Sequence, residues 1–194
     1  MGADYLEFDV QASRDGALVV FHDLVLDRLT PLRGSLHSRT LAELREHAIP
    51  TLEEVLELAA GRIGVMAEIK RPWLYRRHDI VARTVRLLDE HAVVLSFSRR
   101  AILETRRLRP KLRTMQHVSV GVPIRRAVGA WAAGFDDDRV TRRGLAKAQR
   151  MGLQTAVYTV NEPARMLELH GLGVAGIFTD RPDLARAALP RRPG

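Results

Sequence analysis

The 194-residue chain contains no cysteine, which excludes disulfide bonds, thiolate metal sites and cysteine nucleophiles. Aromatic residues make up only 5% of the chain, too few for a platform that stacks nucleic-acid bases. No apolar run approaches the roughly 18 residues that a membrane-spanning helix needs. The N-terminus shows no basic segment followed by an apolar one, so no signal peptide is visible, and we expect the chain as written to be cytoplasmic.

Lysine is also scarce, although the chain is basic. The formal net charge is +8, and only 3 of the 31 basic residues are lysines: Lys70, Lys111 and Lys147. The arginines are scattered along the sequence instead of forming a cluster, so we expect no nucleic-acid partner. The positive charge remains compatible with an anionic small-molecule substrate.

What is present is an alternation of short β-branched runs with amphipathic stretches. We predict strands at 5–10, 18–21, 64–69, 93–97, 112–118, 134–135, 153–160 and 176–179. Such alternation favours parallel strands joined by crossover helices, in either a closed barrel or an open doubly wound sheet. We expect a single domain over residues 1–189 and a disordered tail at 190–194.

Helix boundaries carry clear signals. Thr40 with Glu43, and Thr51 with Glu54, have the spacing of capping boxes. Further expected N-caps are Ser98, Thr141 and Asn161, and helices are expected to stop near Gly61, Gly152 and Gly171. No Gly-x-Gly-x-x-Gly follows a predicted strand, which weakens the dinucleotide-binding version of the fold.

The first chemical signal is Glu7-Phe8-Asp9, on the first predicted strand. Side chains alternate along a strand, so Glu7 and Asp9 lie on the same side. Two adjacent carboxylates stay ionised most easily with a cation between them, and oxygen ligands suit Mg²⁺ or Ca²⁺. The alternative is a solvent-facing strand edge.

The second signal is His22, which ends the next predicted strand. Asp15-Gly16 is a hairpin-turn signal just before that strand. A histidine at a strand end, downstream of paired carboxylates, has the pKa range for a general acid or base. The alternative is an ordinary polar loop histidine.

The third signal is Glu68-Ile69-Lys70. Glu68 is able to complete a metal shell with Glu7 and Asp9, while Lys70 is placed to neutralise a phosphate oxygen. The alternative is a simple salt bridge. Weaker candidates are Asn161 and Asp180, each equally compatible with a helix cap, and the acidic run at 136–138, which we interpret as a solvated turn.

Taken in order, these segments resemble the glycerophosphodiester phosphodiesterase family. The resemblance covers essentially the whole chain and rests on seven motifs: residues 2–10, 15–23 followed by 26–28, 49–55, 68–70, 96–97, 158–161 and 179–183. It implies a TIM-type (β/α)₈ barrel with a small insertion around residues 14–50.

The same resemblance implies hydrolysis of a glycerophosphodiester to sn-glycerol 3-phosphate and an alcohol. Glu7, Asp9 and Glu68 would hold one divalent cation, Mg²⁺ or Ca²⁺, and His22 would be one of two acid/base histidines. Lys70 would contact the phosphate as a catalytic and substrate-binding residue. The further substrate-binding residues would be Phe97 and Tyr158, the latter in the glycerol pocket.

One departure from the family pattern shapes the expectations. The family begins with a strand ending in His-Arg-Gly, followed by a Pro-Glu-Asn-Thr stretch, and neither occurs here. We therefore expect a barrel without its first βα unit, with strand edges open to self-association and activity lowered at least about a hundredfold by the missing second histidine. A signal peptide in the missing segment would change the expected location.

Three hypotheses remain at this point. The first is a metal-dependent phosphodiesterase. The second is an inactive truncated barrel that at most binds a cation or an anionic ligand. The third is a related barrel phospholipase that acts on lysophospholipids.

Overall fold

The structure is a computed structural model that describes residues 2–190. The expected tail at 190–194 falls, from residue 191 on, outside the described residues. The chain divides into two compact units, which are described separately here: Tyr5–Arg113, the N-terminal unit, and residues 2–4 with 114–190, the C-terminal unit. The assignment of a single domain over 1–189 stays a prediction.

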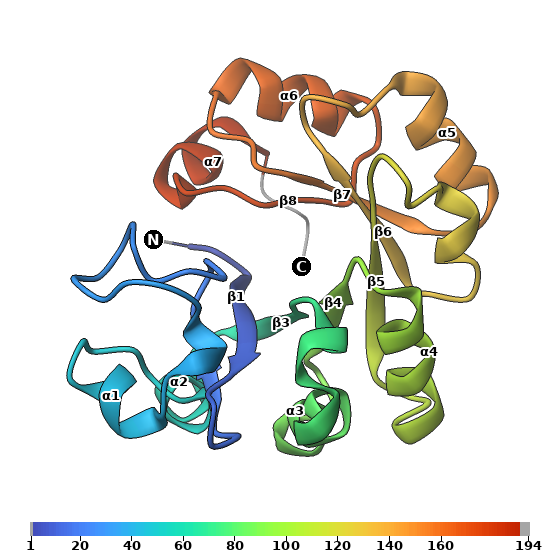
Figure 1. Ribbon diagram of the computed structural model, residues 1–194. Coiled ribbons are helices and arrows are strands. Elements are labelled where there is room, and N and C mark those ends of the chain that lie inside the picture. The colour runs from blue at the N-terminus through green and yellow to red at the C-terminus, as the bar shows by residue number, and fades with distance from the viewer. Residues whose placement is uncertain (1, 191–194) are drawn as a thin grey trace. The chain divides into compact units, whose positions relative to one another are not determined.

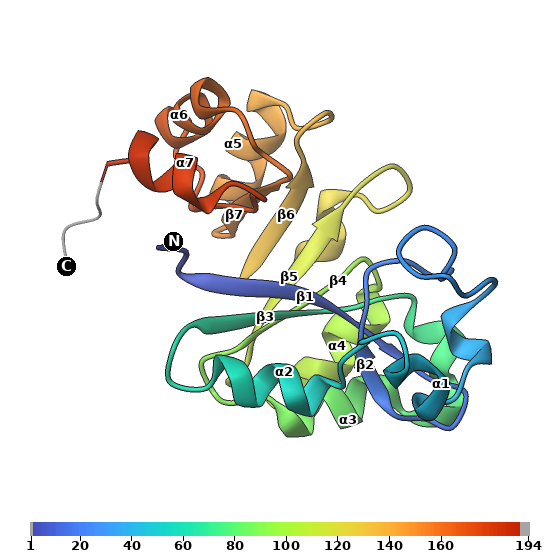
Figure 2. The ribbon, with the colours of Figure 1, turned by 90° about the vertical axis from the view of Figure 1, so that its left-hand side faces the viewer.

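The N-terminal unit contains strands β1 to β4 in the order β2-β1-β3-β4. Figure 1 labels β1, β3 and β4, and Figure 2 also labels β2. Strands β1, β3 and β4 are parallel, and β2 runs antiparallel to β1. The elements are β1 (Tyr5–Ala12), β2 (Leu18–Val20), η1 (Leu36–Ser38), α1 (Leu41–Arg45), α2 (Leu52–Ala59), β3 (Gly64–Ile69), η2 (Pro72–His78), α3 (Ile80–Leu87), β4 (Val93–Ser96) and α4 (Arg99–Leu108).

The core of this unit lies between the strands and their helices. Figure 2 shows α2 and α3 together on one side of β1 and β3. The apolar face of α3 is buried through Ile80, Val81 and Val85, which join Val10 and Ile69 of the strands in one cluster. This packing holds the strands rigidly, so their C-terminal ends are a firm base for a site.

The expected insertion around residues 14–50 contains β2, η1 and α1. The Asp15-Gly16 turn connects β1 to β2, with Gly16 at a φ of 87° that favours glycine. The segment has a small core of its own: Val19, Leu26, Leu36, Leu44 and Ile49. The antiparallel pairing of β2 covers Val10, Gln11 and Ala12 of β1, and self-association through strand edges stays a prediction.

The C-terminal unit contains four parallel strands in the order β5-β6-β7-β8. Its elements are β5 (Arg113–Val118, beginning at the unit boundary), η3 (Ile124–Ala127), β6 (Ala132–Asp136), α5 (Arg142–Arg150), β7 (Gln154–Tyr158), α6 (Pro163–Gly171), β8 (Gly176–Ile177) and α7 (Pro182–Ala188). Leu145, Val157 and Leu169 are among the residues of its separate core.

Most predicted helix boundaries are confirmed. Both capping boxes are formed, and Ser98 and Thr141 cap α4 and α5. Asn161 is a wrong prediction, because α6 begins at Pro163 with Glu162 as its N-cap. The predicted helix stop near Gly171 is confirmed, because α6 ends at Gly171, and the positive φ follows at Gly173.

Candidate active site

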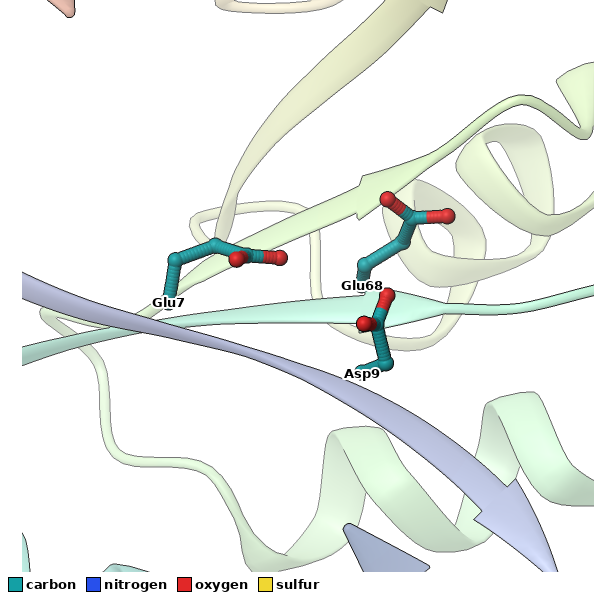
Figure 3. A group of neighbouring side chains, drawn as sticks. All are labelled: Glu7, Asp9 and Glu68. Atoms are coloured by element: carbon teal, nitrogen blue, oxygen red, sulfur yellow. The ribbon is translucent and has the colours of Figure 1, made fainter. Parts of the chain in front are cut away.

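Three carboxylates meet on one side of β1 and β3. Glu7 and Asp9 alternate with Phe8 along β1, and the parallel register places Asp9 directly opposite Glu68 of β3. Figure 3 shows the three carboxylates on the same side of these strands. One oxygen from each of the three lies within 4.8 Å of the others, which confirms the predicted convergence.

The strands bury this cluster unevenly. Asp9 and Glu68 are 7% and 8% exposed, whereas Glu7 is exposed. Loss of hydration and the charges of Asp9 and Glu68 raise the pKa of Glu7 to about 8. Burial and the Glu68 charge also raise the pKa of Asp9, while Lys70 opposes that shift. Three crowded carboxylates of this kind fit a hard divalent cation, because oxygen donors and negative charge are what Ca²⁺ and Mg²⁺ require.

Lys70 follows β3 and lies beside the cluster. Its Nζ is 3.0 Å from an Asp9 carboxylate oxygen and donates a 3.0 Å hydrogen bond to the carbonyl oxygen of His22. Lys70 therefore ties the loop after β2 to the carboxylates. Its location beside them is also compatible with the predicted contact to a phosphate oxygen.

His22 lies in the loop directly after β2, and its orientation is set by an adjacent carboxylate. Its Nδ1 is 2.6 Å from an oxygen of Asp23. Arg28 in turn donates to Asp23 over 2.7 and 3.0 Å, and these contacts hold the pKa of Asp23 well below its usual range. The remaining Nε2 of His22 is on a largely exposed ring, where it is available for proton transfer. The sequence motif contained Asp23 and Arg28, but only the geometry assigns them this orienting role.

A buried glutamine that sequence reasoning missed holds the His22 loop in place. Gln11 of β1 is fully buried, and its side-chain amide donates to the carbonyl oxygens of Phe21 and Asp23 over 2.6 and 2.8 Å. Tyr75 of η2 donates a 2.7 Å hydrogen bond to the Gln11 amide oxygen. The only available signal was an unexpected polar residue within a strand that is otherwise buried at this end.

Phe97 follows β4 and lines a cleft of about 260 Å³ next to the carboxylates. The other residues lining the cleft are Glu68, Ile69, Lys70, Arg71, Trp73 and Ser98. The cleft forms here because β3 and β4 are parallel neighbours, so the loops that follow them leave the sheet side by side. Phe97 as a substrate-binding residue stays a prediction, and its position in this cleft supports it.

Tyr158 belongs to the C-terminal unit, at the end of β7. Its ring packs edge-on against His117 at a centroid distance of 4.6 Å, and both rings contact Phe178. His117 is buried, and a Cβ at Gly134 would lie 2.4 Å from its Nδ1, so β6 requires glycine opposite this ring. The role of Tyr158 in substrate binding stays a prediction.

The weaker candidates, which are Asn161, Asp180 and the acidic turn at 136–138, make local structural contacts. The Asn161 side chain accepts a hydrogen bond from the Asp180 backbone and donates one to the Asp180 carboxylate. Asp180 is not the N-cap of α7, since Arg181 takes that position. In the 136–138 turn, Asp137 forms a 2.8 Å ion pair with Arg165 and so is less solvated than predicted. No helix of the described residues is long and apolar enough to cross a bilayer.

Comparison with known proteins agrees with this arrangement. The model of the glycerophosphoryl diester phosphodiesterase family matches residues 1–184. A glycerophosphodiester phosphodiesterase of Bacillus subtilis is 30% identical over 222 residues, which cover 95% of this chain and 76% of the relative.

Solved structures share the fold. A phosphodiesterase of Oleispira antarctica, solved with the product sn-glycerol-3-phosphate, is 24% identical and superposes with a TM-score of 0.86 over 96% of this chain and 85% of its own. A glycerophosphodiester phosphodiesterase of Agrobacterium tumefaciens is 28% identical, with a TM-score of 0.70 over 96% and 87% of the two chains. The fold is thus α/β of the TIM-barrel type, as predicted, and the absence of a first βα unit stays a prediction. The chain belongs to the glycerophosphoryl diester phosphodiesterase family, whose members are phosphoric diester hydrolases.

Proposed function

We propose that this chain hydrolyses glycerophosphodiesters to sn-glycerol 3-phosphate and an alcohol, with a divalent cation held by Glu7, Asp9 and Glu68. The observation that carries the proposal is the convergence of these carboxylates within 4.8 Å, beside a lysine and an oriented histidine. Family membership supplies the substrate class.

Each residue has a role that follows from its surroundings. A cation bound by the three carboxylates would polarise the phosphoryl oxygens and offset charge that develops on them. Lys70 adds a positive charge next to the same carboxylates, so it is positioned to neutralise a phosphate oxygen.

His22 handles the proton in this proposal. Asp23 accepts the Nδ1–H of His22. This leaves Nε2 either to take a proton from the attacking nucleophile or to give one to the leaving oxygen. Hydrolysis breaks one phosphorus–oxygen ester bond and consumes one water molecule. Phe97 and Tyr158 are proposed to contact the organic parts of the substrate.

The test is release of sn-glycerol 3-phosphate from glycerophosphoglycerol, measured with Mg²⁺ and with Ca²⁺. We expect His22→Ala to lower the rate by about 10²–10⁴-fold, the usual effect of losing a general acid or base. His91→Ala is the matched control, because His91 is an exposed surface histidine.

The metal role is tested separately by calorimetric titration of both cations into the wild type and Glu68→Gln. We expect Glu68→Gln to weaken binding, while Glu90→Gln, at an exposed position, leaves it unchanged. No product with either cation would disprove the activity. Equal cation binding by the wild type and Glu68→Gln would disprove the metal site.

A further inference from the structure

The cleft between the loops after β3 and β4 has one cationic group without a partner. Lys70 is engaged by Asp9, but the side chain of Arg71 makes no hydrogen bond or ion pair within residues 2–190. Arg71 nevertheless lines the cleft, next to Glu68 and Lys70. It is therefore the positive charge of this cleft that is open to a ligand.

The backbone at Arg71 is held in an unusual conformation. Its φ and ψ are 41° and 57°, in the left-handed region that a residue with a Cβ seldom adopts. The η2 segment that follows is held against β1 by the buried hydrogen bond from Tyr75 to Gln11. Because strained backbone persists only where its surroundings enforce it, the position of Arg71 at the cleft is imposed by the fold.

The other residues that line the cleft include two with aromatic side chains and one with a small side chain. Trp73, which is 51% exposed, comes from η2 just after Arg71, and Phe97 and Ser98 follow β4. At about 260 Å³ the cleft is smaller than the roughly 300–1,000 Å³ of sites for drug-sized ligands. It suits a small alcohol and not an acyl chain.

We propose that this cleft is the subsite for the leaving alcohol, and that Arg71 makes it select alcohols bearing a negative charge over those bearing a positive charge. The inference rests on the proposed function, because the neighbouring carboxylates define where the phosphodiester lies. A quaternary ammonium would gain contact with the Trp73 face, but it would meet the Arg71 charge in the same small cleft.

The subsite is tested by binding, independently of turnover. Three phosphonate analogues of glycerophosphodiesters, with a methylene in place of the leaving oxygen, carry 3-hydroxypropanoate, glycerol or choline as the alcohol part. The chain has two tryptophans, so Trp131→Phe leaves Trp73 as the fluorescent reporter. Dissociation constants are measured in the presence of Ca²⁺.

We expect the carboxylate analogue to bind most tightly and the choline analogue most weakly. Arg71→Gln should reduce the ratio of the two affinities by about fivefold, as expected for a partly exposed ion pair. Arg76→Gln is the matched control, because Arg76 is an exposed arginine of the same segment that does not line the cleft. It should leave the ratio unchanged.

Three results would overturn the subsite: no change in Trp73 fluorescence with any analogue, tighter binding of the choline analogue, or the same affinity ratio in Arg71→Gln and its parent. The corresponding diesters are assayed in parallel. If the analogues bind with the expected dependence on Arg71 but no diester is hydrolysed, the subsite stands and the proposed activity fails.

Discussion

At the residue scale, Glu7 links the proposed cation site to pH. Partial loss of hydration and two neighbouring carboxylates bring its pKa to about 8, so without a cation this residue holds a proton at neutral pH. A cation bound by the cluster has to displace that proton. Protons and the cation therefore compete for the same oxygens.

We expect Ca²⁺ affinity to increase as pH rises from about 6 to about 9, because deprotonation of Glu7 frees an anionic ligand. Calorimetric titration at several pH values measures this. Glu7→Gln should weaken binding and flatten its pH dependence, and Glu90→Gln should change neither. Cation affinity that is constant over this range in the wild type would contradict the prediction.

Gln11 is the second residue of consequence, because it connects three segments through its buried amide. Its partners are two carbonyl groups of the His22 loop and the hydroxyl of Tyr75. The position of the His22 loop thus depends on a fully buried residue of β1. Burial raises the pKa of Tyr75 to about 12, so this hydroxyl remains a donor across the working pH range.

Tyr75→Phe should lower the free energy of unfolding by about 1–3 kcal/mol, because it leaves the buried Gln11 oxygen without its donor. Tyr5→Phe is the control, since among residues 2–190 the Tyr5 hydroxyl accepts only a long, 3.4 Å hydrogen bond from Arg113. Urea denaturation of both variants measures the difference. Equal stability of Tyr75→Phe and the wild type would show that solvent replaces the lost donor.

At the element scale, local signals set most boundaries in this chain. In α2, Thr51 and Glu54 bond each other's backbone amides, as their spacing predicted. Asn161 was also expected to cap a helix, but its side chain instead bonds Thr179 and Asp180 across the loops of the C-terminal unit. A cap residue is predictable from sequence only where no tertiary partner competes for its side chain.

Thr51→Ala should destabilise the chain by about 1 kcal/mol, because the first turn of α2 loses an acceptor for its free amide. Thr51→Ser retains the hydroxyl and should recover most of that loss. The two variants are compared by denaturant unfolding. A serine variant as unstable as the alanine variant would assign the effect to the Thr51 methyl group and not to the cap.

At the scale of the whole molecule, the carboxylate cluster is a local source of instability without a cation. Glu7 has a higher pKa in the folded chain than its ordinary value of 4.5, so the folded state holds the extra proton. The stability that this bound proton gives the folded state is fully present below about pH 4.5, and it is lost as pH rises through about 8. Solvent at the exposed Glu7 side chain weakens this effect.

We therefore expect this loss to lower the melting temperature of the cation-free chain as pH rises from about 5 to about 8. Ca²⁺ should raise the melting temperature most near pH 8. A cation at about 100 times its dissociation constant adds about 2.7 kcal/mol. Scanning calorimetry with and without Ca²⁺ measures both effects. Stabilisation of equal size in Glu7→Gln and the wild type would contradict the link to this cluster.

The sequence by itself determined the alternation of strands and helices, the capping boxes and the identities of the three carboxylates and His22. These follow from local rules: side-chain alternation along strands, cap spacing and residue chemistry. The cluster was predictable because Glu7 and Asp9 share one side of their strand and the parallel register sets Asp9 opposite Glu68.

Only the tertiary structure decided how the site is held and where it opens. The Gln11 contacts, the pairing of Lys70 with Asp9 and the cleft beside Arg71 join residues far apart in sequence or depend on one strained backbone turn. Such contacts depend on the packing of whole elements, which leaves no periodic pattern in the sequence. For that reason the carboxylates of β1 and β3 were predictable, whereas the contacts of Gln11, Lys70 and Arg71 were not.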